Sequence, residues 1–85
     1  MSTQLNSEQH QMVKIIHDHA VRFPRNEEGD AQLLQSCYDY MGAFKRVIDS
    51  TSPSQMAHIC QHYKGFYRFA QLMEKLAQGI ADGRV

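Results

Sequence analysis

The sequence predicts an all-α fold in which a short first helix packs on a long antiparallel helical hairpin. Apolar residues recur every three or four positions along the chain, which is the spacing of helices that bury one face. Breaks near the two prolines, Pro24 and Pro53, divide this pattern into three helical segments. The 85 residues contain no internal repeat, low-complexity segment or long linker, so we expect one domain over 1–85.

The first predicted helix covers about 7–23. Asn6 is a favourable N-cap residue, and Gln9 lies three positions later, where its side chain can complete a capping box. Pro24 ends the helix because it lacks an N–H donor and disfavours helical geometry in the residue before it.

The second predicted helix covers about 27–49. It begins in a cluster of acidic residues, which are favoured near a helix N-terminus, and Lys45 and Arg46 complement the helix dipole in its last turns. Its buried face is predicted to contain Leu33, Leu34, Cys37, Tyr40, Met41, Phe44, Val47 and Ile48.

The third predicted helix covers about 53–81. Ser52 is a good N-cap, proline suits the first helical position, and Gln55 completes a second capping box. The short turn before it predicts the antiparallel hairpin. Gly65 lies inside this segment and could divide it, but the apolar stripe crosses Gly65 in phase, so we expect one continuous helix.

The second half of this third helix carries apolar side chains around much of its circumference, which indicates burial on two sides. The first helix could cover the second flank in a monomer, or a second chain could cover it in a dimer; we expect a homo-oligomer. The predicted contact with a partner consists of Phe69, Leu72, Met73, Leu76 and Ile80. Its predicted polar rim consists of Lys64, Arg68 and Lys75.

Composition narrows the possible functions. Nine basic and nine acidic side chains give zero net charge, which argues against an acidic DNA mimic and against a polyanion binder that relies on bulk charge. Two cysteines are too few for a secreted disulfide scaffold, so Cys37 and Cys60 are expected as reduced, buried thiols. Without an apolar signal segment or a membrane span, the protein is expected to be cytoplasmic.

Five histidines suggest a metal site as one alternative. His58 and His62 lie one helical turn apart, a spacing that can chelate zinc, copper or nickel. A third ligand could come from His10, His17 or Asp18, or from a second copy of the chain. We nevertheless expect no bound metal or cofactor, because two ligands alone do not make a site. His19 joins the apolar stripe of the first helix, where a half-buried imidazole would titrate near neutrality.

A second alternative is a nucleic-acid-associated regulator that uses Lys64, Arg68 and Lys75, although no known DNA-binding motif is visible. No glycine-rich phosphate loop or catalytic acid–base pair is present, so we expect no enzymatic activity. The sequence therefore favours a small, non-catalytic helical interaction or regulatory module that self-associates and binds a protein partner of unknown identity.

Overall fold

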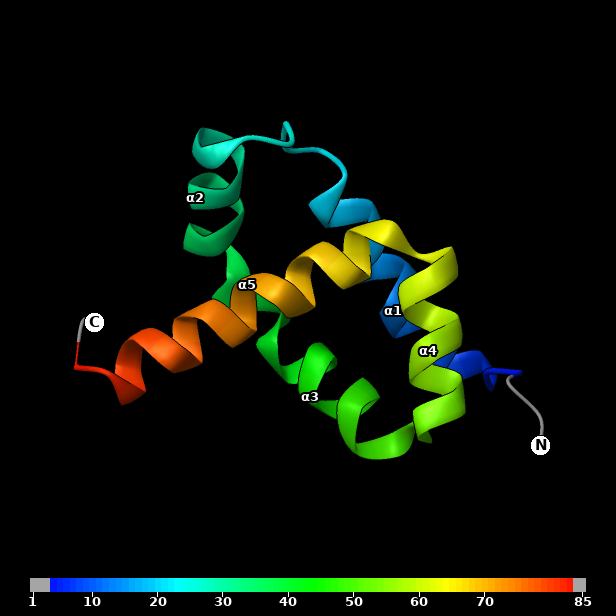
Figure 1. The fold of residues 1–85 in the computed structure, drawn as a ribbon. Helices are drawn as coiled ribbons and strands as arrows, with labels where there is room; N and C mark the ends of the chain where they lie inside the picture. The colour runs from blue at the N-terminus through cyan, green and yellow to red at the C-terminus, as the bar shows by residue number, and fades with distance from the viewer. Residues whose placement is uncertain (1–3, 84–85) are drawn as a thin grey trace.

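Five α-helices and one short 3-10 helix form the computed structural model, which describes residues 4–83. They are α1 (Ser7–Ala20), α2 (Glu27–Gln35), the 3-10 helix η1 (Cys37–Tyr40), α3 (Met41–Ser50), α4 (Pro53–His62) and α5 (Lys64–Ala81) (Figure 1). The all-α class is confirmed, and no strand occurs within this range. The prediction of three helices is wrong, because the second and third predicted segments are each interrupted. The extreme ends of the predicted domain, 1–3 and 84–85, lie outside the described residues.

Both predicted capping boxes are confirmed. At the start of α1, the Gln9 N–H donates to Asn6 Oδ1 at 2.7 Å, and the Asn6 N–H donates to Gln9 Oε1 at 3.0 Å. At the start of α4, the Gln55 N–H donates to Ser52 Oγ at 3.2 Å, and the Ser52 N–H donates to Gln55 Oε1 at 2.9 Å. Each box satisfies amide donors that have no partner inside the helix.

The second predicted helix is interrupted after Gln35. The Ser36 hydroxyl donates to the carbonyl oxygen of Leu33 at 3.0 Å, a local bond with which serine competes against continued helix formation. The backbone then tightens into η1, and α3 begins only at Met41. The start at residue 27 is therefore confirmed, but the continuous helix over 27–49 is not observed. The first helix also ends earlier than predicted, at Ala20.

The third predicted helix is interrupted at Tyr63, whose φ of −120° and ψ of 82° are not helical. Two residues later, the Gly65 N–H donates to His17 Nδ1 on α1 at 2.9 Å. A Cβ atom on Gly65 would collide with the His17 carbonyl oxygen, so glycine allows the two backbones to approach. This close approach holds the start of α5 on α1, and the expectation of one helix over 53–81 is wrong.

The helix α5 lies across the molecule and packs mainly against α1, while α1 also packs against α3 (Figure 1). The helices α3 and α4 follow each other in sequence but make little contact, so the predicted long antiparallel hairpin does not form. The helix at the centre of the packing is α1. The sequence analysis instead placed this first helix against one side of a hairpin formed by the other two. The buried apolar core consists of Val13, Ile16, Ala20, Leu33, Cys37, Val47, Ile59, Phe66, Phe69 and Leu72.

Candidate functional site

The apolar stripe of α5 passes from the core to the surface toward the C-terminal end of the helix. Phe69 is fully buried and Leu72 is 8% exposed, whereas Ile80, about two turns further, is 59% exposed. Met73 and Leu76, between them, are half-buried. Figure 1 shows this end of α5 projecting beyond the neighbouring helices. Of the predicted contact residues, Phe69 and Leu72 therefore belong to the core of the single chain, and the other three remain accessible.

The exposed part of the stripe forms one wall of a groove, and α3 forms the other wall. This groove, called the α3–α5 groove below, has a volume of about 410 Å³. A single charged residue, Lys45, takes part in the lining. Phe44 connects the groove to the core, since its ring packs against Phe66 at 5.4 Å and Phe69 at 5.2 Å between centroids. The lining comprises Met41, Gly42, Phe44, Lys45, Met73, Leu76, Ala77 and Ile80.

Gly42 lines the groove on the α3 side, where the space is open. A Cβ atom at this position would meet no other atom within 4 Å, in contrast to Gly65. The sequence pattern placed Met41 and Phe44 on the buried face of the second predicted helix, whereas Met41 is 39% exposed in the structure. It missed the contribution of α3 to the site, because periodicity does not show that this part of α3 leaves a groove beside α5.

A second hollow lies on the other side of Leu76. Its volume is about 380 Å³, and it is formed by α2, η1 and α5. Tyr38 at its edge is 75% exposed. Because Leu76 lines both this hollow and the α3–α5 groove, the accessible apolar surface continues across α5 rather than stopping at one flank. The hollow is lined by Ala31, Leu34, Gln35, Cys37, Tyr38 and Leu76.

Arg68 has a structural role that the sequence did not reveal. Its guanidinium donates to Asp30 Oδ1 from Nε at 2.9 Å and from a terminal nitrogen at 2.7 Å. Three further bonds go to the carbonyl oxygens of Ala20, Phe23 and Pro24, at 3.1, 2.7 and 2.6 Å. These five bonds use the five N–H donors of the side chain. Arg68 thus connects α5 to the end of α1, the following loop and α2, and has no donor left for a ligand.

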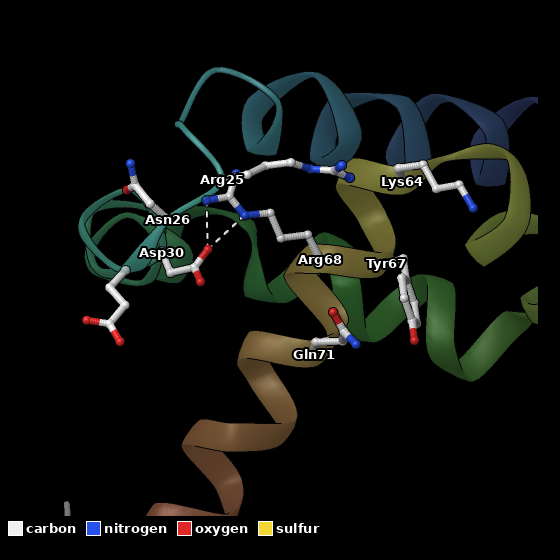
Figure 2. A pocket seen from close by; sticks show the side chains of 8 residues that line it. Arg25, Asn26, Asp30, Lys64, Tyr67, Arg68 and Gln71 are labelled. Atoms are coloured by element: carbon white, nitrogen blue, oxygen red, sulfur yellow. Dashed lines mark hydrogen bonds and ion pairs between the residues drawn. The ribbon is translucent and has the colours of Figure 1, made fainter.

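The surroundings of Arg68 form a polar cavity of about 520 Å³ (Figure 2). Figure 2 shows the Arg68 side chain directed at Asp30, while the Lys64 side chain points away from this pair. Lys64 and Lys75 are exposed. Of the three residues predicted for the polar rim or nucleic-acid face, Lys64 and Lys75 therefore lie on the surface, whereas Arg68 connects helices of the same chain. Arg68 and Asp30 lie 38 positions apart, so no local sequence signal indicated their pairing.

The histidines occupy three separate environments. The rings of His58 and His62 lie 4.3 Å apart between centroids on α4. His10 and His17 instead contact the Tyr63 ring edge-on, at 6.1 and 5.7 Å. In the described part of the chain, no group of three or more histidine, cysteine or acidic side chains is arranged to hold a metal ion. The third ligands that the first helix offered to His58 and His62, namely His10, His17 and Asp18, are thus not brought to them.

Both cysteines are free thiols, with Cys37 buried and Cys60 half-buried. Burial raises the pKa of both thiols, since it disfavours the thiolate; Lys64 partly opposes this effect at Cys60. Neither cysteine therefore has the environment of an activated nucleophile.

No helix within residues 4–83 combines the length and the apolar character needed to cross a membrane. Comparison with known proteins gave no match to a family model, to a curated protein or to a solved structure.

Proposed function

We propose that this protein is a non-catalytic helical interaction module that self-associates through the α3–α5 groove and the exposed end of α5. The observation that carries this proposal is the continuation of the core stripe of α5 into the solvent, from buried Leu72 to Ile80 at 59% exposure, beside an apolar groove. Apolar surface gathered in this way favours association, because each buried apolar Å² contributes about 25 cal/mol.

A second copy of the chain is the occupant that this surface fits. In a two-fold dimer the same patch serves both subunits, so it must be complementary to itself. Ile80 supplies the protrusion at the end of α5, and the open space beside Gly42 supplies the hollow on α3. In the proposed dimer, each Ile80 side chain enters the partner's groove near Gly42.

The charges of the chain are compatible with this pairing. The net charge is zero, so two copies do not repel each other through their overall fields. Lys45 lines the groove, and Glu74 is exposed on α5 one turn before Ala77. A two-fold arrangement can bring Lys45 of each copy toward Glu74 of the other, at the edge of an apolar centre.

The groove lacks the chemistry of an active site. Lys45 is its single ionisable residue, so no acid–base pair or activated nucleophile faces the cavity. The nucleic-acid and metal-binding alternatives remain untested predictions, and no arrangement of the described side chains favours either of them.

The first test is the mass of the protein in solution, measured by light scattering over a dilution series. Wild type is expected to approach twice 9.8 kDa. Ile80→Lys should weaken the dimer roughly 100-fold, since a symmetric contact loses two buried isoleucines at about 1.5 kcal/mol each. Ile15→Lys is the matched control, because Ile15 is 45% exposed on α1, away from the groove. A monomeric wild type, or equal weakening by both variants, would overturn the proposal.

A second pair of variants separates docking from folding. Gly42→Glu places a carboxylate in the groove, but it should not destabilise the monomer, because the space there is open and acidic residues are favoured near a helix N-terminus. Gly42→Ala adds only a methyl group at the same place. We expect the glutamate variant to be folded and monomeric and the alanine variant to be folded and dimeric. A folded dimer from Gly42→Glu would exclude this groove from the contact.

A further inference from the structure

The His19 side chain of α1 contacts η1, the segment that directly precedes the groove-lining residues of α3. Its ring stacks on Tyr40 of η1, with 4.1 Å between centroids and 19° between planes. Phe23 contacts the same ring edge-on at 5.2 Å. The imidazole is thus held between two aromatic rings, at the junction where η1 lies against the end of α1.

The hydrogen bonds at this junction indicate which ring nitrogen of the neutral His19 imidazole carries the proton. The Ser36 hydroxyl has one proton, which it donates to the Leu33 carbonyl oxygen at 3.0 Å. Both contacts of this hydroxyl, to Leu33 and to His19 Nε2 at 2.8 Å, are satisfied together when it donates to the carbonyl oxygen and accepts from an Nε2–H. In this arrangement the neutral ring carries its proton on Nε2, and Nδ1 keeps its lone pair. Nδ1 is buried and has no hydrogen-bond partner in the structure of residues 4–83.

A second proton on the His19 ring, at Nδ1, would have no hydrogen-bond acceptor in this environment. Protonation at Nδ1 would create a buried cationic N–H without a partner, which the ring can satisfy only by leaving its position. Burial is the main cause that lowers the pKa of His19, and the nearby charge of Arg22 lowers it further, whereas Asp39 in η1 acts in the opposite direction. These are the charged groups that act on the ring, and Tyr40 is the titratable group stacked on it.

The position of Tyr40 connects this ring to the groove. Tyr40 is the N-cap residue of α3, and the next two residues, Met41 and Gly42, line the groove. We propose that His19 is a pH-sensitive latch, which holds η1 and the first turn of α3 on α1 when neutral and releases them in mild acid. The effect on docking rests on the proposed function, whereas the latch itself is a property of the single chain.

The direction of the pH effect follows from the lowered pKa. The released state binds the proton more readily than the latched state, so protonation favours release. The stabilising contribution of the latch is complete above the ordinary histidine pKa of 6.5 and is lost as the pH falls below it, through the folded-state pKa.

The latch is tested on the full chain by NMR titration of the histidine rings and by thermal unfolding at several pH values. In wild type, the His19 and Tyr40 ring signals should shift together, with a midpoint below the ordinary histidine pKa of 6.5. His19→Gln keeps an N–H donor for Ser36 but cannot be protonated, so the fall in melting temperature between about pH 7.5 and 5.5 should be several degrees smaller than in wild type. The matched control His62→Gln should retain the wild-type fall. An equal fall in all three proteins, or a His19 midpoint at or above 6.5, would overturn the latch. The titration is measured on wild type and needs no variant.

Light scattering at the same two pH values separates the latch from the proposed function. Acid should weaken the wild-type dimer at least threefold more than it weakens the His19→Gln dimer. Equal weakening of both dimers would overturn the effect on docking even if the latch titrates as expected. A monomer at both pH values, combined with the expected titration, would refute self-association and leave the latch supported.

Discussion

Alanine substitutions at Gly65 and Gly42 should change the stability of this protein in opposite directions. Both glycines are the second residue of a helix, α5 and α3 respectively, so the change in helix propensity is similar at the two sites. Their surroundings differ. A methyl group on Gly65 would collide with the His17 carbonyl oxygen and lie 2.9 Å from its Nδ1, whereas a methyl group on Gly42 meets nothing within 4 Å.

The expected magnitudes follow from these contacts. Alanine is favoured over glycine in a helix by about 0.5–1 kcal/mol, which is the whole effect expected for Gly42→Ala. At Gly65 the same gain is opposed by about 1–3 kcal/mol for overpacking against a backbone, and by about 1 kcal/mol for the weakened bond to His17. The net loss for Gly65→Ala is therefore about 1–3 kcal/mol, a large share of the roughly 4–13 kcal/mol typical of a domain this size.

Thermal unfolding followed by circular dichroism, at a low protein concentration, measures both effects. In a domain of this size 1 kcal/mol corresponds to roughly 4–8 °C, so Gly65→Ala should lower the melting temperature by roughly 5–20 °C and Gly42→Ala should raise it by a few degrees. If Gly65→Ala were as stable as wild type, the close approach of α5 to α1 and the reason given for the break at Tyr63 would both be refuted.

Two further predictions concern Arg68 and the thiols. Arg68→Met should cost about 2–3 kcal/mol in urea unfolding, because it leaves Asp30 and three carbonyl oxygens without their donor; a loss that disappears at high salt would instead indicate a simple surface ion pair. Cys37 and Cys60 should both react slowly with a disulfide reagent near neutral pH, with Cys37 the slower because it is more buried, and urea should accelerate both; fast reaction of folded Cys37 would contradict its raised pKa and burial.

The features that were predicted correctly depend on residues close together in the sequence. The capping boxes at Asn6 and Ser52 each join residues three positions apart, so the residue types alone indicate them. The helical periodicity likewise shows which side chains share a face. It does not show what that face contacts, and for this reason Arg68 was assigned to a solvated or ligand-binding surface although it connects three segments of the same chain.

The candidate site was predicted only in part, because periodicity shows which side chains share a face but not what that face contacts. The excess of apolar side chains on the last turns of α5 was visible in the sequence, and Met73, Leu76 and Ile80 do line an accessible groove. The burial of Phe69 and Leu72 depends on how far the rest of the chain covers α5, which the sequence pattern does not contain.

The sequence by itself determined the all-α class, the starts of three helices and the apolar character of the last one, because these depend on periodicity and on contacts within one helical turn. The tertiary structure alone decided where the two long predicted helices break, that α1 is central, and which part of the α5 stripe is exposed. These features depend on contacts such as that between Gly65 and His17, 48 positions apart, whose geometry arises only when the helices pack.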